Sequence, residues 1–217
     1  MRAFIQRYLD PAGRLGEMLF ALIMALGFTG AVRLGHEQAD NHALLVGILG
    51  CNLAWAIVDG VMYVLNALFE RGRKNRLIRH IAATLDEDAA LRSVADELDD
   101  RLEPLTTREE RDRFYRGVLR RVRDGKLEPA GIGREDFLGG VAVALLISVV
   151  TLPIIAPFLV LSDPGLAARV SNSIALALLF LLGARWGRIV GGRWFRIASG
   201  LTLLGVVLVG ITISLGG

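Results

Sequence analysis

Residues 137–161 read FLGGVAVALLISVVTLPIIAPFLVL and contain no ionisable side chain. A helix that crosses a bilayer needs about 20 mainly apolar residues, so this stretch is long enough to span. Mean hydropathy over the 217 residues is +0.48, and 53% of them are hydrophobic, an excess over ordinary soluble domains. The sequence therefore predicts an all-α, polytopic membrane helix bundle with five transmembrane helices, the other four in the apolar blocks at 17–32, 43–69, 166–184 and 195–215.

A densely charged stretch, residues 70–136, separates the second and third predicted spans. Its apolar residues follow a helical period, first in continuation of the second span and then over 91–102, before Pro104. Thr107 and Glu110 form a capping-box pattern that opens a third helix, which ends at Gly125. We therefore predict three parts: the first two spans in 1–69, a three-helix cytoplasmic insert in 70–136 and the last three spans in 137–217.

Basic residues concentrate in alternate loops, and cytoplasmic loops carry the lysine and arginine excess. This pattern places the N-terminus and the insert in the cytoplasm and the C-terminus outside. We expect a bacterial inner membrane, because the termini are short and no targeting segment is evident. The basic residues in question are Arg2, Arg7 and Arg14; Arg71, Arg73, Lys74, Arg76 and Arg79; and Arg185, Arg188, Arg193 and Arg196.

Several function classes find no support in the sequence. The net charge of +3 is too small to suggest nucleic-acid binding, and the single cysteine, Cys51, cannot form an intrachain disulfide. There is no Walker loop, no His-Glu-x-x-His and no Cys-x-x-Cys. We therefore predict neither catalytic residues nor a bound cofactor.

Asp59 is the clearest candidate for function, because an ionisable residue inside a span is costly. Asn52, Asp59 and Asn66 are seven residues apart and share one helix face, on which Met62 also falls. Such a face suits a cation path. The alternative is that Asp59 is protonated or hydrogen-bonded to another helix and only holds the bundle together.

The first span offers a second set of ligands. Glu17 and Met24 are also seven residues apart on one face. Carboxylate and thioether groups together suit a borderline divalent metal such as Fe²⁺ or Mn²⁺. Alternatively, Glu17 is a solvated carboxylate at a helix end and Met24 simply packs.

Three further features of the sequence could serve function, but ordinary packing or solvation could also explain each of them. Pro153 and Pro157 free backbone carbonyls in the third span, for a cavity or for a partner helix. Glycines of the last two spans permit close helix approach. One face of the insert could bind a cation or form an ordinary solvated surface; its acids are Asp96, Asp100 and Glu103.

The layout resembles the vacuolar iron transporter family, which has five spans and a three-helix cytoplasmic insert. Residues 19–22 (LFAL) and 27–31 (GFTGA) resemble the family's first-span run, and residues 152–158 (LPIIAPF) resemble its third-span proline pair. The sequence from 177–184 (ALLFLLGA) onward, through Ser199-Gly200 and the glycine-rich fifth span, resembles its C-terminal end. The family's first-span Asp-Gly pair is absent, so that only Glu17 can substitute. The insert has neither paired Glu-x-x-Glu segments nor methionine.

The resemblance implies a homodimer that exports Fe²⁺ or Mn²⁺ from the cytoplasm in exchange for protons, with metal gathered by the insert. Asp59 stands near the family's second-span glutamate. The alternative function is a non-transporting membrane protein whose charged insert docks a partner protein.

Overall fold

The computed structural model describes residues 1–35, 41–125 and 131–214, and these residues form helices and no strand. The chain divides into two compact units. We call Met1–Val64 with Gly133–Gly217 the apolar unit and Leu65–Ile132 the charged unit. The all-α prediction is therefore confirmed. Part of the outer loop expected between the first two spans, residues 36–40, lies outside the described residues.

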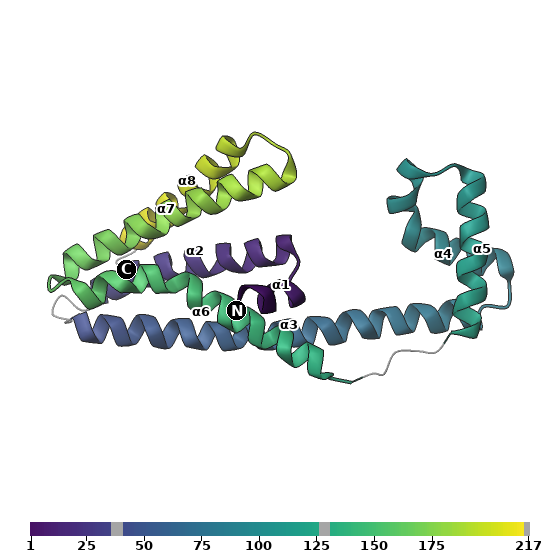
Figure 1. The fold of residues 1–217 in the computed structure, drawn as a ribbon, viewed down its shortest axis with the longest axis horizontal. Helices are drawn as coiled ribbons and strands as arrows, with labels where there is room; N and C mark the ends of the chain where they lie inside the picture. Colours follow the sequence, from purple (N-terminus) through teal and green to yellow (C-terminus); the bar gives the residue numbers. More distant parts are fainter. Residues whose placement is uncertain (36–40, 126–130, 215–217) are drawn as a thin grey trace. The chain divides into compact units, whose positions relative to one another are not determined.

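The apolar unit contains α1 (Arg2–Tyr8), α2 (Pro11–Gly35), α6 (Arg134–Val160), α7 (Pro164–Val190), α8 (Trp194–Ser214) and the first part of α3 (Asn41–Ala83) (Figure 1). In the described residues, four helical stretches have the length and composition to cross a membrane: Leu45–Ala83, Arg134–Val160, Pro164–Val190 and Trp194–Ile211. α2 is 25 residues long and contains the first predicted span. These helices expose large apolar side chains suited to lipid, such as Leu159 and Leu203, which are 67% and 63% exposed.

The centre of the apolar unit is a seam between α2, α6 and α7. Leu22 and Leu26 from α2 are fully buried there with Ile154 and Leu179. The hydroxyl of Ser171 on α7 donates a hydrogen bond of 2.8 Å to the carbonyl of Ile154 on α6. Because side chains from three helices share this seam, it fixes their mutual register.

Glycines set how closely α7 and α8 approach each other. A Cβ on Gly183 or Gly187 of α7 would lie 2.7 or 2.5 Å from backbone atoms of α8, so both residues allow the close pairing of α7 and α8 (Figure 1). By contrast, Gly191 ends α7 in the left-handed conformation, with φ 72°. Close approach, predicted for the last two spans, is therefore confirmed at Gly183 and Gly187, while Gly191 instead forms a helix cap.

The charged unit consists of the end of α3, α4 (Glu87–Leu102), the 3-10 turn η1 (Glu103–Leu105) and α5 (Arg108–Asp124). α3 runs without a break from the second predicted span into this unit, as the sequence predicts. The expected capping box at Thr107 and Glu110 is present. Hydrogen bonds from Thr107 hold the pKa of the Glu110 carboxyl below its usual value.

A small apolar core holds the three helices of the charged unit together. Its buried members are Ile81, Ala90, Val94, Tyr115 and Leu119. The Tyr115 hydroxyl donates a hydrogen bond to Asp99, whose carboxylate also pairs with Arg111 at 3.3 Å. Burial, together with Asp99, raises the pKa of Tyr115 to about 12. The sequence-predicted helices thus pack on each other.

Candidate functional site

Asp59 and Asn52 lie on one face of α3 inside the apolar unit. The side chain of Asn52 is buried, and that of Asp59 is half-buried. Oδ1 of Asn52 and Oδ2 of Asp59 are shielded from solvent, and neither accepts a hydrogen bond from the described part of the chain. A buried acceptor without a partner costs about 1–3 kcal/mol. Two such oxygens on one face therefore need an explanation beyond helix packing.

Glu17 brings a second carboxylate from α2. It is half-buried, and its carboxylate is near enough to that of Asp59 for the two negative charges to repel each other. The rings of Phe20 on α2 and Trp55 on α3 meet edge to face, with centroids 5.7 Å apart. Each ring is about one turn from the carboxylate on its own helix, so this contact joins the two helices beside the carboxylates.

The remaining predicted ligands lie in different surroundings. Met24 on α2 is half-buried. Met62 on α3 is 47% exposed. Asn66 is exposed and belongs to the charged unit. The structure therefore brings Glu17 near Asp59 and shields Asn52 and Asp59.

The side chains of Asp59, Glu17 and Asn52 offer hard oxygen ligands. Two carboxylates and one amide oxygen can bind a divalent cation, or one carboxylate can take up a proton and relieve the repulsion between the pair. In the residues that the structure describes, no three His, Cys, Asp or Glu side chains come together as a ready-made metal centre. A metal bound here would thus rely on two acids and on neutral ligands.

Backbone packing next to Asp59 is a feature that the sequence reading missed. α3 and α6 cross with backbone contact at Gly60 and Gly140, where a Cβ on either residue would lie within 2.8 Å of the other's carbonyl oxygen. One turn further along α3, the Tyr63 hydroxyl donates to the carbonyl of Tyr8, at 3.1 Å. The Gly-Gly pair at 139–140 was the available signal.

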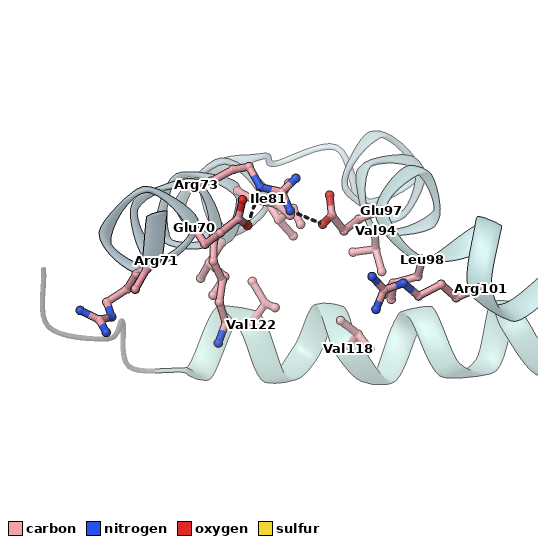
Figure 2. Close-up of a pocket in the computed structure, with 14 residues that line it drawn as sticks. Glu70, Arg71, Arg73, Ile81, Val94, Glu97, Leu98, Arg101, Val118 and Val122 are labelled. Carbon is pink, nitrogen blue, oxygen red and sulfur yellow. Dashed lines mark hydrogen bonds and ion pairs between the residues drawn. The ribbon is translucent and has the colours of Figure 1, made fainter. Parts of the chain in front are cut away.

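The charged unit has a groove between α3, α4 and α5, with a volume of about 850 Å³ (Figure 2). Val94, Leu98, Val118 and Val122 form apolar walls. At the rim, Arg73 bridges Glu70 at 3.3 Å and Glu97 at 3.6 Å, which Figure 2 shows as dashed lines.

The acidic face predicted for the insert is open to solvent. Asp96, Asp100 and Glu103 are all exposed. They are not part of any cluster of three or more possible metal ligands in the described residues. A metal-gathering role for this face therefore remains a prediction from the sequence.

The chain matches no protein-family model, and no curated protein matches it at a significant level.

Proposed function

We propose that the chain is a five-span membrane transporter that exports a divalent cation, Fe²⁺ or Mn²⁺, from the cytoplasm in exchange for protons. In this proposal α2 is the first span, the N-terminus and the charged insert are cytoplasmic, the C-terminus is outside, and the protein works as a homodimer in a bacterial inner membrane. The observation that carries the proposal is the pair of shielded oxygens on Asn52 and Asp59, with the carboxylate of Glu17 close by.

The proposed cycle needs only that metal and proton compete for the same carboxylates. From the cytoplasmic side, the cation binds the carboxylates of Asp59 and Glu17 and the amide oxygen of Asn52, with Met24 and Met62 as additional soft ligands. Protons from the outer side then displace it, since a carboxylate oxygen that carries a proton loses its affinity for metal. Few charged ligands favour release, because transport requires a cation to leave as well as to enter.

A conservative variant tests this scheme. Asp59→Asn keeps the size and the oxygen of the side chain but removes its charge and its ability to exchange a proton. We expect Mn²⁺ transport driven by a pH gradient to fall at least tenfold in proteoliposomes. The matched control is Asp124→Asn, the same substitution at an exposed acid of the charged unit, which should transport like the wild type. Equal transport by Asp59→Asn and the wild type would show that the exchange scheme is wrong.

The groove of the charged unit favours a second candidate function, the docking of a partner protein. Its apolar walls and charged rim suit a partner segment with both apolar and charged side chains. Partner docking gains support if the folded protein transports no divalent cation and a deletion strain keeps its metal tolerance. It also requires that a partner protein recovered by pull-down with the wild type is lost with Leu98→Lys in the groove. Cation flux that depends on Asp59 would count against it.

A further inference from the structure

A second, smaller cavity lies in the apolar unit. It has a volume of about 290 Å³ and is bordered by α1, the first turns of α2, the middle of α6 and the last turns of α7. Its walls include the apolar side chains of Leu15, Met18, Leu146 and Ile189. Two arginines, Arg14 from α2 and Arg185 from α7, also line it. The remaining lining residues are Met1, Ile5, Gln6 and Pro11. The cavity therefore combines an apolar wall with two positive charges.

Neither arginine forms an ion pair with an acid of the described residues. None of the described residues that line the cavity is acidic. Asp10 accepts from the backbone N–H of Gly13 at 2.7 Å, and Glu135 pairs with Arg7 at 3.3 Å. Glu17 lies one turn from Arg14 on α2, but it does not line the cavity and forms no ion pair with Arg14. Neither guanidinium has an ion-pair or hydrogen-bond partner in the described part of the chain, so the cavity is suited to an anion.

The place of the cavity in the fold indicates which kind of anion it binds. α6 and α7 are two of the helices long and apolar enough to span a membrane. Arg185 lies in the last turns of α7, beside Trp186 and close in sequence to Trp194, and indole rings favour the membrane–water interface. The arginine distribution predicts that this end of the helices lies in the cytoplasmic leaflet, where anionic lipids are concentrated.

We propose that this cavity binds the phosphate group of an anionic phospholipid from the inner leaflet. Arg14 and Arg185 pair with the phosphate oxygens, for which the planar guanidinium is well suited. The volume is close to the lower limit of about 300 Å³ for ligand cavities, so it holds the headgroup region and not the acyl chains. The chains then extend along the apolar wall into the bilayer. This inference rests on the proposed membrane setting and orientation of α6 and α7 and does not depend on metal transport.

The first test uses the full-length wild type in detergent with three probes: phosphatidylglycerol, phosphatidylcholine with the same acyl chains, and inorganic phosphate. Native mass spectrometry counts bound lipid, and thermal unfolding measures stabilisation. We expect phosphatidylglycerol to bind and stabilise more strongly than phosphatidylcholine, because only the former has a net negative charge. Equal binding of the two lipids would overturn the proposal. Stabilisation by inorganic phosphate alone that equals that by phosphatidylglycerol would also overturn it, since the ligand would then be a free anion.

The second test assigns the preference to the two arginines. The measured quantity is the preference, the ratio of the affinity for phosphatidylglycerol to that for phosphatidylcholine. Each basic residue near a lipid surface contributes about fivefold to it, so the double variant Arg14→Gln/Arg185→Gln should lower the preference about 25-fold. The matched control is Arg193→Gln/Arg196→Gln, which removes the same charge but leaves the lining of the cavity intact. Loss of preference in the cavity variant alone supports the proposal. Equal loss in both variants, or loss in neither, contradicts it.

The pair Arg14→Lys/Arg185→Lys covers the case in which the glutamine variant does not fold. It keeps the positive charge but removes the planar, two-pronged donors, so it should bind phosphatidylglycerol more weakly than the wild type and more strongly than phosphatidylcholine. Loss of all preference for the anionic lipid in this folded variant would contradict the assignment. Neither test measures cation flux, so failure here is distinguishable from failure of the transport proposal.

Discussion

The crossing of α3 and α6 gives the sharpest structural prediction, because it involves backbone atoms directly. A Cβ on Gly140 would lie 2.6 Å from the carbonyl oxygen of Gly60. The closest favourable C···O contacts are about 3.3 Å long, so Gly140→Ala must move the two backbones apart by roughly 0.7 Å. Overpacking of a close contact costs about 1–3 kcal/mol. Since Gly60 directly follows Asp59, the displacement also moves the proposed cation site.

The assay compares Gly140→Ala with Gly50→Ala in the same full-length protein. Gly50 is also in a helix, but a Cβ there meets no atom within 4 Å. We expect Gly140→Ala to lower the thermal midpoint in detergent by roughly 2–4 °C for each kcal/mol lost. It should also slow Mn²⁺ flux, while Gly50→Ala keeps wild-type flux and has a thermal midpoint no lower than that of the wild type, because alanine favours a helix more than glycine does. An unchanged midpoint for Gly140→Ala, measured beside a normal Gly50→Ala, would refute the close crossing.

Three further predictions concern the charged unit. Thr107→Ala removes the cap of α5 and should destabilise that helix by about 1 kcal/mol, seen as faster hydrogen exchange of its amides; unchanged exchange would contradict the capping role. The folded pKa of Glu110 is lowered, so its stabilising effect is complete above its ordinary pKa of 4.5 and is lost as pH falls through the folded value. The protection factors of the α5 amides, which correct for the intrinsic pH dependence of hydrogen exchange, should fall over that acidic range in the wild type, and more than in Glu110→Gln. Tyr115 has its folded pKa raised from 10.0 to about 12, so the stability it gives is complete below pH 10 and is lost as pH rises toward about 12. An ultraviolet difference titration against Tyr115→Phe should show this late ionisation, and a midpoint near 10.0 would contradict the role of Asp99.

The helices were predictable from the sequence wherever their signals are local. The capping box at Thr107 and the stop at Gly125 define α5 within a few neighbouring residues, and the structure places α5 at Arg108–Asp124 between them. The continuation of α3 into the charged unit was equally visible, because apolar residues keep a helical period after the second span. Such signals need no knowledge of distant parts of the chain.

The geometry of the candidate site was only partly predictable. Periodicity places Asn52 and Asp59 on one face of α3, but it does not state which atoms lack hydrogen-bond partners. The nearness of Glu17 to Asp59 depends on how α2 packs against its neighbours, which is set by contacts such as that between Phe20 and Trp55. These relations join residues that are more than thirty positions apart in the sequence.

The glycines of α7 also show that regular spacing in the sequence does not reveal the role of each residue. In the sequence, Gly183, Gly187 and Gly191 form one regular series of small residues. In the structure, the first two allow α7 and α8 to touch, and the third is a left-handed helix cap. Spacing alone predicts that small residues share a face, while the partner helix and the chain direction decide what each of them does.

Flux measurements in proteoliposomes test whether Asp59 belongs to a proton-coupled cation path. Fe²⁺ and Mn²⁺ transport is measured with and without a pH gradient for the wild type and Asp59→Ala, with folding checked by thermal unfolding of each preparation. We expect wild-type flux that requires the gradient and is abolished in Asp59→Ala. Absence of flux for both ions in folded wild-type protein, or equal flux in Asp59→Ala, would contradict it.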